Sequence, residues 1–476
     1  MFNRKYLNSI FIIFCNLFII LNSSAIDNRK LSDAEIENVI NRSYQYVALY
    51  NVINKNAIVK VGDRKVYSWN SVFTQKELTD QSDETIARPN NDTLYSKALL
   101  DLSNDAVVLH VPVINSKYVS LETSAYDHYM NVPLSNLNGD YTQPLKILFY
   151  TSRTKSYKAG KKIRGIDKYI EMSGDFIMAM HRVMPHANDP DRFEIIKNQM
   201  AAIKAEPLSQ YLGKKIARNE RKAFPEVGYT DADIFGKNLL EVMQFVFNHT
   251  SFDKKKYSLD DEVLKVYKKL GIEPGKKWNP ELENSIDHKK FKEISLKVQL
   301  QQTTLSRDQG YVRELNPYLF QPKGTAGIEV MLFQSVFGPF GLPIEQAVYP
   351  PVNTADRQPL NALNDYLIRI KKDDLPPAKS FWSFTLYDSL HGYFIPNEYK
   401  KYSVGLNSGY KLNSEGGIEI YISEKKPANV PLENWLPINR VNQNLDILLR
   451  IYEPDLEKIY TWTAPVVELL KNEKLN

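Results

Sequence analysis

The sequence predicts a mixed α+β protein in which two β-rich regions flank a helical middle section. The segments 117–124 and 381–388 alternate apolar and polar residues with the period of two that β-strands show. Between them, several segments place apolar residues at helical spacing. The chain also has 29 Tyr and 21 Phe, and its 25 Pro exceed its 20 Gly, which favours many strands and turns. A chain of 476 residues is long enough for two or three such regions.

The first residues have the pattern of a secretory signal peptide. Arg4 and Lys5 precede an apolar run at 10–21, and small residues end at Ala25, so we expect cleavage there and a segment 1–25 that is removed. An uncleaved anchor stays open. The mature chain is then expected in the periplasm or secreted, with no integral membrane span. The single cysteine, Cys15, lies inside this run, which excludes disulfides and thiolate metal sites from the mature chain.

Residues 26–190 are predicted to form an N-terminal β-rich domain. Ser32 and Glu35 form a capping-box pattern, which predicts a helix over about 33–51. Short strands and turns are expected over 54–70. The longer strand candidates are 106–113, 117–124, 146–151 and 175–183.

Residues 191–305 are predicted to be a helical middle section. Asp189 and Pro190 are a good helix start, and this helix should run to about Glu206. Three further helices are expected, one from 230, one over 258–270 and one over 287–304. The lysines of this section alternate with acidic residues and the formal net charge is only +5, so we predict no nucleic-acid binding.

Residues 306–476 are predicted to return to β structure. Besides 381–388, strands are expected over 418–422, after a hairpin signal at 414–417, and over 445–452. Pro454 should close the last of these, because proline cannot continue a central ladder.

These C-terminal segments also carry a family resemblance. Segments 381–388, 392–394, 402–405, 434–437 and 450–454, with Asn397, resemble Domain of Unknown Function 1214. Segments 91–96, 100–103 and 108–112 resemble its usual N-terminal companion, Domain of Unknown Function 1254. The resemblance implies two β-sandwich (jelly-roll-like) domains with helices between and around them, often in exported bacterial proteins. It implies no activity.

One candidate site is a polar cluster in the N-terminal region. Asp92, Tyr95 and His128 are the catalytic candidates, because a carboxylate, a phenol and an imidazole can accept, donate or shuttle a proton. Arg88 and Asn91 are candidate ligand-binding residues. The structural alternative is that Asn91 and Asp92 cap a turn while Arg88 pairs with Asp92 or a backbone carbonyl.

A second candidate is Arg182, whose guanidinium can grip a carboxylate or phosphate bidentately or form an ordinary structural salt bridge. His181 and His186 lie nearby with carboxylates, but Pro185 and Pro190 break the regular geometry that a shared metal would need. We therefore predict no metal site and no cofactor.

A third candidate set lies in the C-terminal strands. Trp382 and Tyr387 could form a stacking platform for a flat ligand, although alternating aromatics are more often core. Arg450 stands in an apolar strand and needs a partner, for which Asp388 and Glu453 are the natural candidates.

Two hypotheses follow, and the sequence does not decide whether the chain is an enzyme. The first is an exported protein that binds a small molecule in a pocket between two β-sandwich domains. The second is a periplasmic hydrolase that uses Asp92, Tyr95, His128 and Arg182 for general acid–base catalysis. Convergence of these four in one concave pocket would favour the enzyme, and burial in separate turns would exclude it. A homodimer stays open as the oligomeric state.

Overall fold

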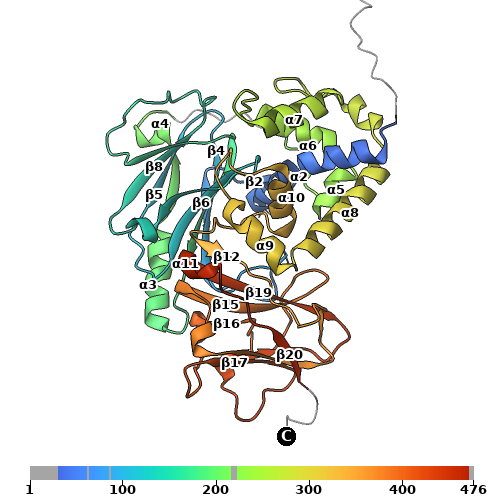
Figure 1. Cartoon of the computed structure of the whole chain (residues 1–476). Helices are drawn as coiled ribbons and strands as arrows, with labels where there is room; N and C mark the ends of the chain where they lie inside the picture. The colour runs from blue at the N-terminus through green and yellow to red at the C-terminus, as the bar shows by residue number, and fades with distance from the viewer. Residues whose placement is uncertain (1–29, 62–63, 85–86, 216–221, 471–476) are drawn as a thin grey trace, which may run out of the picture.

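The computed structural model describes residues 30–61, 64–84, 87–215 and 222–470. The expected signal peptide and Cys15 lie outside these residues. Figure 1 shows a β-sheet unit beside a group of helices, with a second β-sheet unit across one end of both. The predicted α+β class is confirmed.

The N-terminal sandwich consists of two sheets that enclose an apolar core. The first sheet has the order β3 (Ser71–Thr74), β4 (Leu94–Asp101), β10 (Phe176–Val183), β6 (Val119–Ala125) and β7 (Asn131–Ser135). The second has the order β11 (Lys204–Pro207), β5 (Val107–Val111), β8 (Leu145–Tyr150) and β9 (Lys168–Glu171). Alternate residues of both sheets, such as Leu121 and Ile147, meet in the core, as the period of two requires.

The helical region packs on the outer face of the first sheet. Its centre is α2 (Asp33–Ala57), which is buried along most of its length. The capping box predicted at Ser32 is present, with the Glu35 carboxylate accepting from the Ser32 amide at 2.9 Å. Around α2 lie α5 (Asp231–Phe235), α6 (Leu239–Asn248), α7 (Ser258–Lys268), α8 (His288–Leu305) and α10 (Ile328–Phe337). Helix α9 (Gln309–Leu315) follows α8 and packs near α10.

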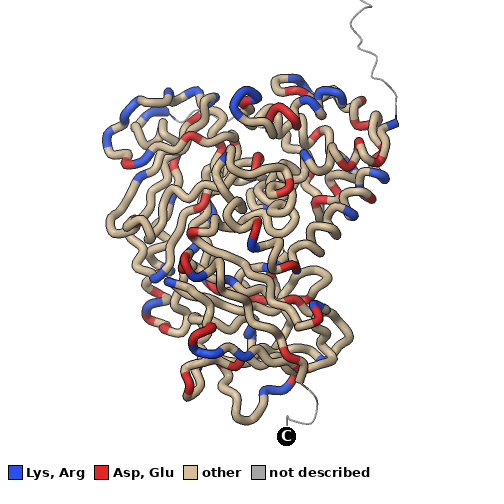
Figure 2. Tube along the Cα trace, viewed as in Figure 1, with Lys and Arg blue, Asp and Glu red and all other residues tan. Residues whose placement is uncertain are grey.

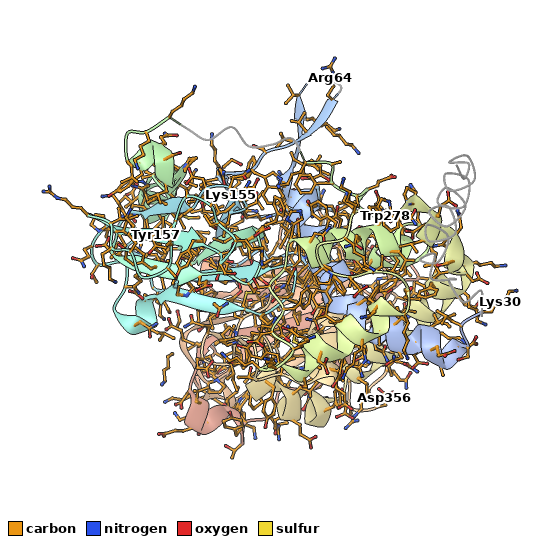
Figure 3. The ribbon with its side chains drawn as sticks, turned by 90° about the horizontal axis from the view of Figure 1, so that it is seen from above. Lys30, Arg64, Lys155, Tyr157, Trp278 and Asp356 are labelled. Carbon is orange, nitrogen blue, oxygen red and sulfur yellow. The ribbon has the colours of Figure 1, made fainter. Side chains whose placement is uncertain are left out.

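A hairpin of β1 (Ile58–Val61) and β2 (Arg64–Tyr67) follows α2. Seen from above, it projects from the body, and Arg64 lies near its tip (Figure 3). Acidic and basic residues are mixed over the outer loops and helices (Figure 2), as expected for a solvated surface. Among the helices that the structure describes, none is long and apolar enough to cross a membrane.

The C-terminal sandwich has the same two-sheet construction. One sheet has the order β12 (Ala347–Val348), β19 (Asn444–Pro454), β15 (Ala378–Asp388) and β16 (Ser403–Gly405), with β13 (Leu360–Asn361) also paired to β19. The other has the order β18 (Trp435–Pro437), β17 (Ile418–Ser423), β14 (Asp365–Ile370) and β20 (Val467–Leu470). A short helix, α11 (Leu456–Ile459), follows β19, which ends at Pro454 as predicted.

Several elements differ from the sequence-based expectation. The helix from Pro190, α3 (Pro190–Ala201), stops before Glu206, because Lys204–Pro207 pairs with β5 as an edge strand instead. After β11 comes a one-turn helix, α4 (Leu208–Tyr211), that was also not predicted. Strand β4 and helix α10 were not predicted either, since both are buried on nearly all sides and lack a clear periodicity.

Candidate functional site

The two strands that carry most C-terminal candidates have two different faces. In β15, Trp382 and Phe384 enter the core of the C-terminal sandwich, while Ser383 and Tyr387 face the N-terminal sandwich. In β19, the residues flanking Arg450 likewise enter that core, which leaves Arg450 on the opposite face. The strand period of two therefore builds a polar surface on the back of an apolar core.

The opposing surface comes from the first sheet of the N-terminal sandwich. Arg182 on β10 stands directly opposite Tyr95 on β4 and donates to its hydroxyl at 2.8 Å. Its guanidinium also pairs with Glu122 on β6 at 2.8 Å and donates to the Phe340 carbonyl at 3.2 Å. All three charged and phenolic side chains are buried. Burial alone would lower the pKa of Arg182, but Glu122 and the neighbouring tyrosines outweigh it and raise that pKa.

Asp92 and Arg450 meet where the two sandwiches join. Asp92 accepts from the Ser383 hydroxyl, a contact across 291 positions of the chain. Arg450 donates to Thr385 Oγ1 and to the Arg88 carbonyl, each at 3.0 Å. Burial raises the pKa of Asp92, and the Arg450 charge together with the hydrogen bonds from serine hydroxyls opposes that rise.

We call the following residues the buried polar layer: Asp92, Tyr95, Glu122, Arg182, Arg450 and Tyr452, together with Tyr349, which is half-buried but has a buried hydroxyl. Tyr452 accepts from Asn90 Nδ2 at 2.7 Å and stacks on Phe381 with 4.2 Å between ring centroids. Within the described part of the chain, Glu122 Oε2, Arg182 Nε and Tyr349 Oη have no protein partner. Such atoms cost about 1–3 kcal/mol each unless a buried water bonds to them.

His128 is separate from this layer. One ring nitrogen lies 2.8 Å from Ser335 Oγ on α10 and the other 2.9 Å from the Pro339 carbonyl. Burial lowers the pKa of His128 to about 3, so it is neutral near pH 7. The structure thus brings together three of the four residues of the hydrolase hypothesis and leaves out the imidazole.

Two predicted pairings are wrong. Arg88 does not pair with Asp92 but with Asp446, at 2.6 Å, and Arg450 pairs with neither Asp388 nor Glu453. Asp388 instead accepts from the backbone amides of the turn that follows β15. Asp446 belongs to the other sandwich from Arg88, and Arg450 donates both to Thr385 of its own sandwich and to the Arg88 carbonyl of the other. Local sequence could not indicate the contacts between sandwiches.

The two remaining aromatic candidates both lie inside the protein. Trp382 stacks on Tyr410 with 4.7 Å between ring centroids and packs in the C-terminal core. Tyr387 is fully buried and donates to the Pro89 carbonyl at 2.6 Å. Neither lines the interdomain cleft or the smaller cleft described below.

An open site lies at the edge of the same interface. This interdomain cleft encloses about 290 Å³, close to the lower end of the range of about 300–1,000 Å³ typical of small-molecule sites. Asn91 lines it and accepts from the Ser403 hydroxyl at 3.2 Å, so the cleft begins one residue from Asp92. The lining residues are Leu78, Asn91, Tyr399, Lys400, Lys401, Tyr402, Ser403, Asn407, Ser408, Leu432 and Glu433.

Lys401 is the notable group of the interdomain cleft. It is half-buried and donates to the carbonyls of Ser403 at 3.3 Å and Glu433 at 3.2 Å. Burial lowers its pKa to about 8, and Glu433 opposes that fall. Among the described residues no carboxylate lies within ion-pair distance of Lys401. The nearby acidic side chains pair with other lysines, Asp80 with Lys400 at 3.7 Å and Glu433 with Lys411 at 3.7 Å. Sequence reasoning missed Lys401, because one more lysine in a lysine-rich chain carries no signal.

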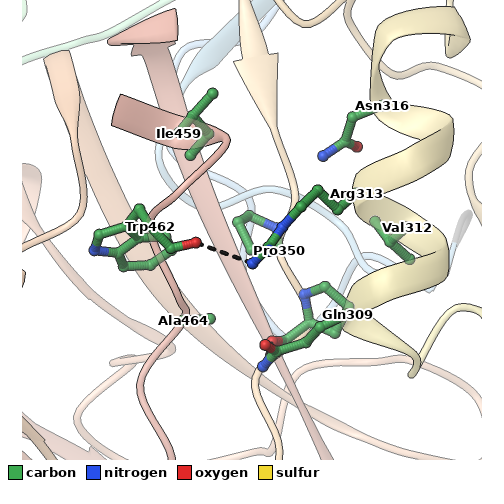
Figure 4. Close-up of a pocket in the computed structure, with 9 residues that line it drawn as sticks. Gln309, Val312, Arg313, Asn316, Pro350, Ile459, Trp462 and Ala464 are labelled. Atoms are coloured by element: carbon green, nitrogen blue, oxygen red, sulfur yellow. Dashed lines mark hydrogen bonds between the residues drawn. The ribbon is translucent and has the colours of Figure 1, made fainter. Parts of the chain in front are cut away.

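A second, smaller cleft lies between α9 and the turn after α11 (Figure 4). Arg313 crosses it and donates to the Trp462 carbonyl at 3.1 Å. Its volume of about 30 Å³ is enough for a water molecule but not for a metabolite. In the described ranges no three His, Cys, Asp or Glu residues are grouped to hold a metal ion.

Comparison with known proteins confirms the resemblance stated from sequence. The family described as Protein of unknown function (DUF1254) matches residues 69–207, and Protein of unknown function (DUF1214) matches residues 346–456. None of the curated proteins matches the chain.

Two solved structures are similar to this one. The VPA0106 protein from Vibrio parahaemolyticus is 20% identical, with a TM-score of 0.66 over 92% of this chain and 100% of that one. An uncharacterized protein from Burkholderia cenocepacia is 14% identical, with a TM-score of 0.41 over 92% and 93% of the two chains. The first likeness shows a shared fold.

Proposed function

We propose that this chain, which belongs to the family that joins a DUF1254 domain to a DUF1214 domain, binds a small polar molecule in the interdomain cleft. The observation that carries this proposal is the cleft itself, which both sandwiches line and which has the volume of a small-molecule site. Following the predicted signal peptide, we also propose that this binding occurs in the periplasm or outside the cell.

The lining suits a polar ligand. Leu78 and Leu432 supply apolar surface, while Asn91, Lys401 and Asn407 supply polar groups. Lys401 is still mainly protonated at pH 7, because its pKa is about 8, and among the described residues no carboxylate lies within ion-pair distance of it. An acidic or strongly polar group of a ligand would therefore gain a charge-assisted hydrogen bond there.

The alternative that the sequence left open, a hydrolase using Asp92, Tyr95, His128 and Arg182, finds less support. None of the four lines the interdomain cleft or the smaller one. The hydrogen-bonding capacity of Arg182 is largely used by Glu122, Tyr95 and a backbone carbonyl. A neutral imidazole whose pKa is about 3 is a poor base.

A thermal-shift screen with small carboxylic acids, hydroxy acids and sugars tests the proposal, because a ligand of the folded state raises the melting temperature by mass action. The matched variants are Leu432→Trp, which fills the cleft from a side chain 49% exposed, and Leu363→Trp, at a site 51% exposed that does not line it. We expect compounds that stabilise the wild type and Leu363→Trp but not Leu432→Trp. Compounds that stabilise all three proteins equally would contradict binding in the cleft.

A further inference from the structure

The polar side chains of the interdomain cleft are mostly engaged with one another or with backbone. Asn91 Nδ2 donates to the Thr79 carbonyl at 2.6 Å, Ser408 Oγ to the Gly405 carbonyl at 2.9 Å, and Asn407 Nδ2 to the Asp92 carbonyl. The Tyr402 hydroxyl donates to Gln81 at 3.2 Å. Lys401 differs from these side chains. Its Nζ donates to two carbonyls, and a protonated amino group has three N–H bonds, so one N–H remains for a ligand.

We propose that the Lys401 amine is a reactive group that forms an imine with the carbonyl carbon of a small aldehyde or ketone bound in the cleft. This inference rests on the proposed function, because it requires that the cleft admit a small polar molecule. It names both the ligand class, a carbonyl compound, and the atom that captures it, Lys401 Nζ.

The backbone of Lys401 is held firmly, which a capturing amine requires. Its amide donates to Asn397 Oδ1 at 3.1 Å, and its carbonyl accepts from Asn397 Nδ2 at 3.0 Å. Gln81 of the N-terminal sandwich accepts from the Asn397 amide at 3.0 Å. The loop is therefore tied both to itself and to the opposite wall of the cleft.

The surroundings also favour the neutral amine, which is the nucleophilic form. Burial lowers the pKa of Lys401 from 10.5 to about 8. About one molecule in ten then carries the neutral amine at pH 7, against fewer than about one in a thousand for an ordinary lysine. The Glu433 carboxylate opposes this fall, but it pairs with Lys411, and Asp80 pairs with Lys400.

The capture step needs no other reactant. The lone pair of neutral Nζ forms a C–N bond to the carbonyl carbon, and the C=O π pair moves to oxygen, giving a carbinolamine after proton transfer from nitrogen. A second proton then leaves nitrogen, the C–O bond breaks, and oxygen departs as water. The product is an imine plus one water, with no change in oxidation state.

Reductive trapping tests the inference. The full chain is incubated with glyoxylate and sodium cyanoborohydride at pH 7, and the modification rate of each lysine is measured by peptide mass spectrometry. Two lysines serve as internal controls: Lys400, which also lines the cleft but pairs with Asp80, and Lys97, whose pKa burial also lowers but which lies outside the cleft. We expect Lys401 to be modified at least about tenfold faster than either, and faster still at pH 8.

Two variants complete the test. Leu432→Trp should slow modification of Lys401 without slowing that of Lys97, and Lys401→Arg should keep the charge but remove the fast adduct. Equal rates at the three lysines, or a Lys401 rate unaffected by Leu432→Trp, would overturn the inference. Acids without a keto group and non-reducing sugars have no free aldehyde or ketone, so binding of these compounds without trapping at Lys401 would refute the imine and leave the proposed function standing.

Discussion

The buried polar layer and the interdomain cleft both lie where the two sandwiches meet, but their charged groups have opposite environments. In the layer, Arg182 and Arg450 are sealed from water and bonded to Glu122, hydroxyls and carbonyls. In the cleft, a few residues away, Lys401 is open to solvent on one side and has no carboxylate partner among the described residues. The charge of Arg182 is therefore bonded mainly within its own sandwich and that of Arg450 to Thr385 and the Arg88 carbonyl, whereas Lys401 keeps a charge that a ligand can bind.

Breaking the layer should have the largest effect on stability. Arg182→Met leaves Glu122 buried without its partner, and we expect the free energy of unfolding to fall by about 3–5 kcal/mol in urea denaturation at pH 7. The double variant Glu122→Leu with Arg182→Met should recover much of that loss, because it leaves no buried charge unpaired. A single variant that loses less than about 1 kcal/mol would contradict this role for the pair.

Asp92→Asn tests the other half of the layer. The amide keeps the shape of the side chain. It loses the negative charge that faces Arg450 and the carboxylate that accepts from the Ser383 hydroxyl. We expect a loss of about 1–3 kcal/mol in the same denaturation experiment. Unchanged stability combined with loss of ligand binding would instead make Asp92 part of the binding site.

The buried histidine His181 should make the stability of the protein depend on pH. His181 is buried with both ring nitrogens lacking a protein partner, and burial lowers its pKa to about 3. The unfolded state, with a pKa near 6.5, takes up a proton first as the pH falls, so stability present above pH 6.5 is lost progressively toward pH 3. When the pH falls from 7 to 5, we expect the free energy of unfolding of His181→Leu to decrease by about 2 kcal/mol less than that of the wild type. Parallel pH profiles for the two proteins would contradict the assignment.

The smallest effect on stability should come from the cleft. Lys401→Met removes a half-buried charge that has no carboxylate partner, so its free energy of unfolding at pH 7 should stay within about 1 kcal/mol of the wild type. Because the folded pKa of Lys401, about 8, lies below 10.5, wild-type stability should rise with pH between these values, and the variant should lack that rise. A large loss at pH 7 would show that Lys401 is structural.

Local sequence predicted the elements but not the way in which they meet. The Ser32 cap and the alternating strands around Leu121 and Phe384 follow from short-range rules and were confirmed. Strand β4 was missed because it is covered on both faces and does not alternate. Edge pairing to β5 cut the helix from Pro190 short of Glu206.

The candidate site shows the same limit more sharply. Asp92 and Tyr95 were chosen for acid–base chemistry, Arg182 for its anion-binding guanidinium, and Arg450 because a buried arginine needs a partner, and the structure does place them together. Their partners lie far away in sequence, as with Ser383 for Asp92 and Asp446 for Arg88. Such pairings depend on how the sandwiches dock, which no local pattern encodes, and openness to solvent at Lys401 is likewise a property of the assembled interface.

The central claim, that the buried polar layer is structural while the interdomain cleft binds the ligand, is tested most directly by one affinity comparison. The best compound from the screen is titrated by calorimetry into the wild type, into the double variant Glu122→Leu with Arg182→Met, and into Leu432→Trp. We expect the double variant to bind within about twofold of the wild type and Leu432→Trp to lose at least about tenfold, or 1.4 kcal/mol. Loss of binding in the double variant with full binding in Leu432→Trp would contradict the account.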